Sequence, residues 1–313
     1  MTDRRFEDEL LRYGPQAGGI IMTVEEANSY CRRLASSHYE NFSVVSFLLP
    51  RELRQHFCNL YAYCRWADDL ADEVGTSQDR LELLAWWRHE LRACLDGQVR
   101  HPVFIALLPT IQQFAIPETP FFALLDAFER DQHQTHYATH EDVLNYCKCS
   151  ANPGGHLVLH LGRCHTPANV LLSDSICTGL QLANFLQDVA EDLDRGRIYL
   201  PRESWGQFNY TEECFRQRIC DDRWQSLMKV EVERASDYFY HGWPLVDQLP
   251  KELRFQIDIV VRGGLAILQA IRDLRYDVWT ARPTIGKLRQ LNLAAGSWLR
   301  QRVLRLTTAR DQG

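Results

Sequence analysis

The spacing of apolar residues limits this chain to one kind of fold. Along almost all of the 313 residues, apolar side chains recur at intervals of three and four, and alternating patterns are few and short. Such a period places the apolar side chains on one face of an α-helix, so the sequence predicts an all-α protein. Prolines and glycines divide the chain into helical segments without a recognisable linker. Helices of this kind favour a single large bundle, so we expect one domain over residues 1–313.

Charge and cysteine spacing exclude several classes of function. The formal net charge of −6 and the pI near 6.0 argue against nucleic acid as a partner, because proteins that bind it usually carry a basic excess. The ten cysteines contain no CxxC pair, so we expect free thiols and a cytoplasmic protein. The N-terminal stretch lacks the apolar core of a secretory signal, and no segment is apolar enough over the length of a membrane span. Contact with a membrane surface remains compatible with this composition.

An acidic cluster follows a run of residues that is typical of a protein interior. Tyr61, Arg65, Asp68 and Asp72 are spaced by four, three and four residues, which places them in one stripe along a helix. Asp69 and Glu73 lie off this stripe. Taken alone, the stripe is equally compatible with a solvated helix face that carries a surface ion pair.

A second polar stripe repeats this geometry. Gln181, Asn184, Asp188 and Asp192 are spaced by three, four and four residues. The opposite face of the same segment is apolar and carries Leu182, Phe185, Leu186, Val189 and Leu193. Amides in register with the acids are not needed for solubility, so the repetition favours a site over a solvated face.

The paired acids predict a site for a hard cation. Two carboxylates one helical turn apart can share one Mg²⁺ or bridge two, and Mg²⁺ keeps waters and phosphate oxygens as its remaining ligands. Zinc fits less well, because it prefers His and Cys. Asp68, Asp72, Asp188 and Asp192 are therefore the predicted metal ligands. Arg65, Arg195 and Arg197 could hold phosphate oxygens by forked hydrogen bonds, although the last two could instead cap a helix C-terminus.

These motifs resemble those of the squalene/phytoene synthase family, over about residues 30–285. The resemblance rests on the Asp68 and Asp188 motifs and on the run Arg195-Gly196-Arg197-Ile198-Tyr199-Leu200-Pro201. It implies an all-helical fold with a central cavity, in which Mg²⁺ and arginines take up diphosphate as a prenyl cation forms. Further residues match the family's pattern. Arg282 is similar to a late diphosphate-binding arginine, Gln181 is expected to assist it, and the expected lining of the reaction centre is Tyr61, Asp131, Tyr146 and Asn184.

Three departures from the family's pattern point to one subgroup. Members that condense two prenyl diphosphates usually carry Ser-x-Ser before a phenylalanine, where this chain has Tyr39-Glu40-Asn41-Phe42, with Asn41 as a candidate diphosphate ligand. Ser150-Ala151-Asn152-Pro153-Gly154 replaces a Val-Ala-Gly run, and its proline should bend the helix. Leu265 stands where others have a late tyrosine. Together, the runs at residues 38–42, 150–155 and 184–201 resemble the bacterial hopanoid-associated subgroup, whose members form hydroxysqualene from presqualene diphosphate.

The resemblance thus implies a Mg²⁺-dependent carbon-oxygen lyase in which water ends the cation cascade. No NADPH is expected, and no glycine-rich dinucleotide motif is present. The expected partners are a prenyl diphosphate substrate, the pathway enzymes before and after this step, and transiently the inner face of the membrane. The alternatives are head-to-head condensation of two farnesyl or geranylgeranyl diphosphates, and an inactive relative that acts as a helical assembly protein. A metal site at His133, His136 and His140 is disfavoured, because no fourth ligand is evident nearby.

Overall fold

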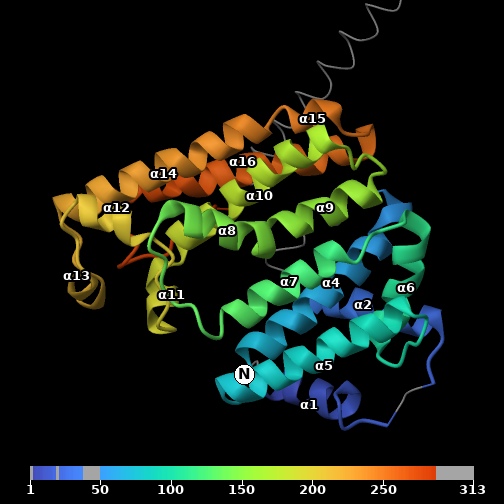
Figure 1. Ribbon diagram of the computed structural model, residues 1–313. Coiled ribbons are helices and arrows are strands. Elements are labelled where there is room, and N and C mark those ends of the chain that lie inside the picture. Colours follow the sequence, from blue (N-terminus) through green and yellow to red (C-terminus); the bar gives the residue numbers. More distant parts are fainter. Residues whose placement is uncertain (1–2, 19–20, 38–49, 287–313) are drawn as a thin grey trace, which may run out of the picture. The chain divides into compact units, whose positions relative to one another are not determined.

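Helices make up all the regular secondary structure in the part of the chain that the structure describes (Figure 1). The structure is a computed structural model, and it describes residues 3–18, 21–37 and 50–286. A lone bridge between His136 and Ile198 is the nearest approach to a strand within those ranges. The all-α prediction is therefore confirmed. None of the described helices is both long enough and apolar enough to cross a membrane.

The contacts within the chain divide it into two compact units. The first unit comprises Met1–Gln134 and His156–His165, and the second comprises Thr135–Gly155 and Thr166–Gly313. The single-domain organisation expected from the sequence stays a prediction.

The first unit is built around one long helix. Its helices are α1 (Asp3–Tyr13), α2 (Val24–Ser37), α4 (Arg51–Asp72), α5 (Ser77–Leu95), α6 (Pro102–Phe114) and α7 (Thr119–Arg130). Helix α4 contacts α2, α5, α6 and α7, which explains why its apolar face is buried along most of its length. Trp66 of α4 stacks on Trp87 of α5, with ring centroids 5.4 Å apart and planes only 13° from parallel. The imidazole of His101 packs edge-on against both indoles.

The second unit is dominated by three long helices. Its elements are α8 (His140–Ser150), the start of α9 (Asn152–Leu161), α10 (Pro167–Gln187), α11 (Val189–Asp194), α12 (Arg202–Gln207), α13 (Glu212–Arg216), α14 (Asp222–Gly242), α15 (Leu245–Gln248) and α16 (Lys251–Asp273). Helices α10, α14 and α16 pack against one another pairwise. A Cβ atom on Gly264 would lie 2.1 Å from the ring of Phe239, so only glycine permits the close approach of α16 to α14. Beside this bundle, Trp224 and Trp279 pack with ring centroids 4.7 Å apart.

The bend predicted at Pro153 is present. Helix α8 ends at Ser150 and α9 begins at Asn152, so the helical path turns at Ala151. Proline has no N–H, so Pro153 cannot donate to the carbonyl of Cys149 and continue the hydrogen-bond pattern of α8, which accounts for the interruption.

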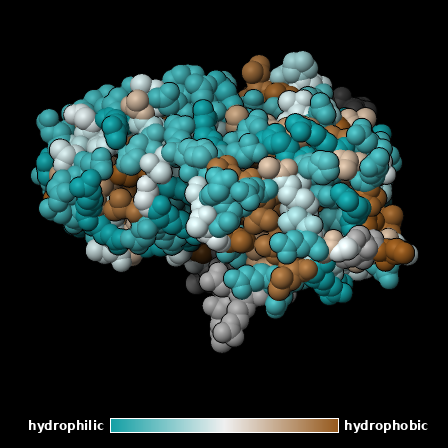
Figure 2. Space-filling view, turned by 60° about the horizontal axis from the view of Figure 1, so that its bottom comes forward, coloured by the Kyte–Doolittle hydropathy of each residue, from teal (hydrophilic) through white to brown (hydrophobic). Residues whose placement is uncertain are grey.

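Hydrophilic residues cover most of the face shown in Figure 2, and apolar residues form smaller patches on it. The large apolar side chains most exposed among the described residues are Leu11, Ile21, Val24, Leu171 and Tyr240. Such scattered side chains are normal for a protein surface.

Candidate active site

The first acidic motif occupies the last turns of α4, which runs unbroken through Asp72. Arg65 pairs with three acids: its guanidinium contacts Asp68 Oδ2 at 3.2 Å and Glu73 Oε1 at 3.0 Å, and it also binds the carboxylate of Asp69. Two acids of α4 and the residue that caps its C-terminus therefore hold the arginine that the sequence assigned to diphosphate.

Asp69 is the buried member of this motif. Its side chain is only 5% exposed, whereas that of Asp68 is 46% exposed. Burial raises the pKa of Asp69 to about 7, and the Arg65 guanidinium acts in the opposite direction. Asp69 and Glu73 lie off the predicted stripe, yet they follow Arg65 by four and eight residues, a spacing that could have identified them as its partners.

Tyr61 and Asp131 also belong to the first unit. Tyr61 is half-buried one turn before Arg65, and burial raises the pKa of its hydroxyl, while Arg65 acts in the opposite direction. Asp131 directly follows α7, and its neighbour Gln132 donates from Nε2 to the carbonyl of Ala71 at 3.1 Å. This hydrogen bond holds the end of α7 beside the first acidic motif.

The second acidic motif lies where α10 gives way to α11. Asp188 interrupts the helix with φ −106° and ψ 16°. The backbone hydrogen bonds from Asp188 to Asn184 and from Asp192 to Asp188 nevertheless persist, at 2.9 and 2.8 Å. Asn184 donates from Nδ2 to Asp188 Oδ2 at 2.8 Å. The predicted polar stripe therefore survives the interruption, and half-buried Gln181 lies one turn before Asn184.

A segment far along the chain pairs with this motif. Arg282 donates from Nε to Asp188 Oδ1 at 2.7 Å, and it lies 3.3 Å from Glu191 Oε1. Gln187 donates from Nε2 to the carbonyl of Pro283 at 2.6 Å. The structure thus brings the predicted diphosphate ligand Arg282 to the predicted metal ligand Asp188, and adds Glu191, which the sequence analysis did not single out.

Asp192 is the most perturbed acid of the second motif. Burial raises the pKa of Asp192 to about 7, the nearby charge of Asp188 acts in the same direction, and Arg195 and Arg197 oppose both. The backbone N–H of Arg197 donates to the carbonyl of Asp192 at 2.8 Å, across a turn in which Gly196 has a φ of 75°. Glycine adopts this left-handed conformation without strain, which suits it to the middle of the Arg-Gly-Arg run.

Aromatic rings adjoin the polar end of the second motif. A small cavity is lined by Phe185, Val189, Asp192, Arg197, Ile198, Tyr199, Leu200 and Phe215. The rings of Phe185 and Tyr199 stack at 3.9 Å, and buried Tyr146 contacts Tyr199 at 5.7 Å between centroids. Tyr199 was not predicted as a site residue, although an aromatic residue two positions after the Arg-Gly-Arg run was a signal for one.

The predicted site residues thus form two groups. Tyr61, Arg65, Asp68, Asp72 and Asp131 belong to the first unit, and Tyr146, Gln181, Asn184, Asp188, Asp192, Arg195, Arg197 and Arg282 belong to the second. Asn41, with the whole Tyr39–Phe42 stretch, lies outside the described residues. A shared clamp made by both acidic motifs stays a prediction.

Each motif offers carboxylates suited to a hard cation. Within residues 3–18, 21–37 and 50–286, no three His, Cys, Asp or Glu side chains converge to hold a metal ion by themselves. Mg²⁺ does not require such a cage, because it commonly binds one or two carboxylates together with waters and substrate phosphates. The Asp188 and Asp192 pair fits this mode of binding.

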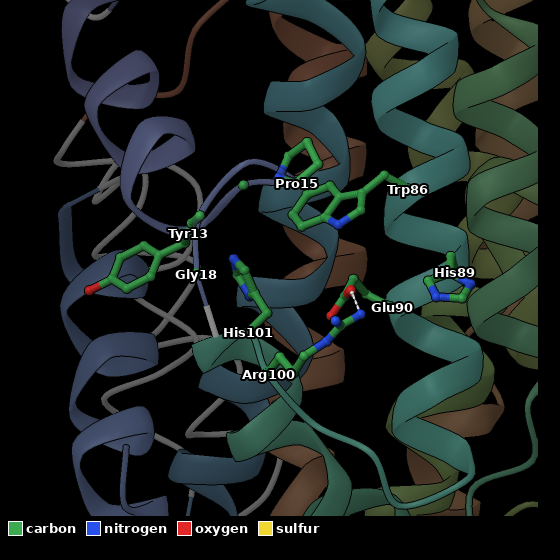
Figure 3. Close-up of a pocket in the computed structure, with 10 residues that line it drawn as sticks. Tyr13, Pro15, Gly18, Trp86, His89, Glu90, Arg100 and His101 are labelled. Atoms are coloured by element: carbon green, nitrogen blue, oxygen red, sulfur yellow. Dashed lines mark hydrogen bonds and ion pairs between the residues drawn. The ribbon is translucent and has the colours of Figure 1, made fainter. Parts of the chain in front are cut away.

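A separate pocket of about 150 Å³ lies in the first unit, between the end of α1 and the helices α5 and α6 (Figure 3). Buried Glu90 pairs there with Arg100 at 2.9 Å. Tyr13, Trp86 and His101 also line this pocket, and it shares no residue with either acidic motif.

Several known proteins are similar to this chain in sequence and in fold. The squalene/phytoene synthase family profile matches residues 35–289. The 15-cis-phytoene synthase of Synechocystis sp. is 30% identical over 294 residues, which is 90% of this chain and 87% of the relative. The solved structure of squalene synthase HpnC from Alicyclobacillus acidocaldarius has 43% sequence identity and a TM-score of 0.78, covering 81% of this chain and 95% of that one. A dehydrosqualene synthase bound to a ligand shares the fold, with 22% identity, a TM-score of 0.82 and coverage of 90% and 98%.

Proposed function

The chain belongs to the squalene/phytoene synthase family, and from that premise we propose that it converts presqualene diphosphate to hydroxysqualene in a Mg²⁺-dependent reaction. The substrate class, a prenyl diphosphate, follows from the family. The finer choice of a carbon-oxygen lyase rests on the sequence departures at Tyr39–Phe42 and at Pro153. The 43% sequence identity with squalene synthase HpnC supports a relationship between the two proteins within the family.

One observation carries the proposal: a carboxylate pair, basic side chains and aromatic rings are assembled in the second unit. Asp188 and Asp192 are proposed to hold Mg²⁺, as are Asp68 and Asp72 in the first unit. When bound, the ion would neutralise charge on the diphosphate oxygens. Arg282 lies 2.7 Å from Asp188, which supports a role for its guanidinium in donating hydrogen bonds to a diphosphate bound to that cation. Arg65, Arg195, Arg197, Gln181 and Asn41 are proposed to assist in binding it.

Breaking the carbon-oxygen bond leaves a positive charge on carbon and a negative charge on the leaving group. Arginines favour this separation, because they stabilise the charge that develops on the diphosphate. The faces of Tyr146, Tyr199 and Phe185 are suited to the cation, because an aromatic ring carries negative potential on its face. Tyr61, Asp131 and Asn184 are proposed to complete the lining of the reaction centre.

The experiment is product analysis after the purified protein and Mg²⁺ are incubated separately with presqualene, farnesyl and geranylgeranyl diphosphates, without NADPH. The proposal predicts hydroxysqualene from presqualene diphosphate and no C30 product from farnesyl diphosphate. Formation of a C30 or C40 product from the shorter substrates would contradict it.

Head-to-head condensation of two prenyl diphosphates is the second candidate. It is favoured by relatives named phytoene synthase that cover most of this chain. The same incubation separates the two candidates, because only condensation consumes farnesyl or geranylgeranyl diphosphate.

An inactive helical assembly protein is the third candidate, and the presence of all four aspartates argues against it. A diphosphate should raise the melting temperature in the presence of Mg²⁺ if the site is functional. No change in the melting temperature would favour the assembly protein. The proposal also includes a cytoplasmic location, transient contact with the inner face of the membrane, and partner enzymes that supply presqualene diphosphate and reduce hydroxysqualene.

A further inference from the structure

The corner between α8 and α9 leaves backbone acceptors without helical donors. Pro153 has no N–H, so the carbonyl of Cys149 lacks the donor that a continuous helix supplies four residues later. The N–H of Gly154 donates to the carbonyl of Ala151 at 3.1 Å. The turn at Ala151 thus creates a polar spot at the end of the helix that carries Tyr146.

The hydroxyl of Ser150 lies at this corner. Its Oγ is buried and has no hydrogen-bond partner among the described residues. A serine inside a helix commonly bonds to the carbonyl four residues earlier, which Ser150 does not do. A buried hydroxyl without a hydrogen-bond partner destabilises the folded state. We therefore expect a partner such as an ordered water molecule at Ser150 Oγ.

The corner itself is firmly held. Thr178 of α10 donates from Oγ1 to Asn152 Oδ1 at 3.2 Å. A Cβ atom on Gly155 would lie 2.4 Å from Ser173 Oγ and 2.7 Å from Cys177 Sγ, so the start of α9 is in close contact with α10. These two contacts hold the start of α9, directly after Ser150, against α10.

Ser150 lies on the same face of α8 as Tyr146. The two residues are one turn apart, which is about 6 Å along the helix axis. The ring of Tyr146 adjoins Phe185 and Tyr199, and these rings in turn line the cavity that contains Asp192 and Arg197. The Ser150 hydroxyl therefore lies on the helix face that carries the Tyr146 ring, one turn from it.

We propose that Ser150 Oγ and the carbonyl of Cys149 hold the water molecule that ends the cation cascade. This inference rests on the proposed function and makes Ser150 a positioning residue for product choice. The water oxygen forms a bond to the cationic carbon, and one of its protons passes to the diphosphate released by ionisation. Substrate and water thereby yield an alcohol and protonated diphosphate. Without a held water, the cation loses a proton from a neighbouring carbon and yields a hydrocarbon.

The test compares the products of wild-type protein and Ser150→Ala, using presqualene diphosphate and Mg²⁺. The ratio of alcohol to hydrocarbon should fall about fivefold or more in the variant, because one hydrogen bond to the water is lost. Ser150→Thr keeps the hydroxyl and should restore the ratio. Ser175→Ala is the matched control: Ser175 donates to the carbonyl of Tyr238 at 2.8 Å, away from the corner, and its loss should leave the ratio unchanged.

Two further results decide the inference. In water labelled with oxygen-18, wild-type alcohol should carry the label. If Ser150→Ala unfolds, Ser150→Cys offers a similar volume with a weaker donor and should give an intermediate ratio. An unchanged ratio in a folded Ser150 variant, with wild-type protein still making labelled alcohol, would overturn this inference and leave the proposed function standing. Wild-type protein that makes no alcohol would overturn both.

Discussion

The two acidic motifs look alike in sequence but are held together differently. In the first, Arg65 binds acids of its own helix, four and eight residues further along. In the second, Arg282 reaches Asp188 from 94 residues away, and the helix is interrupted at the acid itself. A local pairing forms with its helix, whereas a long-range pairing exists only when the rest of the unit has folded. The ion pairs of the first motif should therefore form whenever α4 forms. Those of the second motif depend also on the position of the segment after α16.

The strongest test of this comparison is loss of the acids. Asp68→Ala and Asp192→Ala should each lower turnover by at least about a hundredfold, because even residues behind metal ligands contribute about ten- to a hundredfold. Asp68 is 46% exposed, and truncating Asp192 removes a desolvated carboxyl group rather than an apolar contact, so both variants should stay folded by circular dichroism. Asp194→Ala is the control, since that exposed acid pairs with Arg218 and lies off the stripe. Normal turnover in one variant would remove its motif from the site.

Removing Arg282 should have the next largest effect. Charge-assisted hydrogen bonds contribute about 1.5–3 kcal/mol, so Arg282→Ala should weaken pyrophosphate binding about ten- to a hundredfold in the presence of Mg²⁺. Isothermal titration calorimetry measures this directly. Arg216→Ala is a fitting control, because Arg216 pairs only with nearby Glu212 and Glu213 among the described residues. Unchanged affinity in Arg282→Ala would mean that this arginine serves the fold alone.

The buried acid of the first motif should make stability depend on pH. The folded-state pKa of Asp69 is raised to about 7, so between about pH 4 and 7 the folded state holds a proton that the unfolded state has released. Asp69 therefore lowers the free energy of unfolding as pH rises through this window. Asp69→Asn should remove that part of the slope in urea unfolding at a series of pH values. An identical slope would show that Asp69 stays ionised beside Arg65.

The smallest effects concern the two glutamines that hold the motifs. Gln187→Ala breaks the bond to Pro283, and Gln132→Ala breaks the bond to Ala71, so each should cost about 1 kcal/mol in chemical denaturation. Only the first loosens the segment that carries Arg282, so only Gln187→Ala should also weaken pyrophosphate binding. Exposed Gln78, which bonds to Glu82, provides the control. If Gln187→Ala and Gln132→Ala weakened pyrophosphate binding equally, the proposed difference between the two motifs would be wrong.

Much of this arrangement was predictable because it is local. The helical period, the two polar stripes and the bend at Pro153 depend on residues within a few positions of one another. The pairing of Arg65 with Asp69 was equally local, and its four-residue spacing was visible. The pairing was not predicted, because Arg65 was assigned to the stripe with Asp68 and Asp72, and Asp69 lies off that stripe.

The remaining features depend on contacts between distant residues. The contact of Arg282 with Glu191 joins positions far apart in the chain, and no spacing rule reports it. The interruption at Asp188 occurs without a nearby proline or glycine, so the local sequence carries no breaker signal. Whether the two compact units form one domain likewise depends on their packing rather than on periodicity.

The paired indoles described above give each unit an optical signal of its own. Trp66 and Trp87 are nearly parallel in the first unit, and Trp224 and Trp279 are packed in the second. Near-ultraviolet circular dichroism arises from such fixed aromatic packing and is lost when the packing loosens. Trp87→Phe would remove the signal of the first unit, and Trp279→Phe would remove that of the second. If the signals that remain in the two variants are lost at the same temperature, the two units unfold as one cooperative molecule. If they are lost at different temperatures, the two units unfold separately.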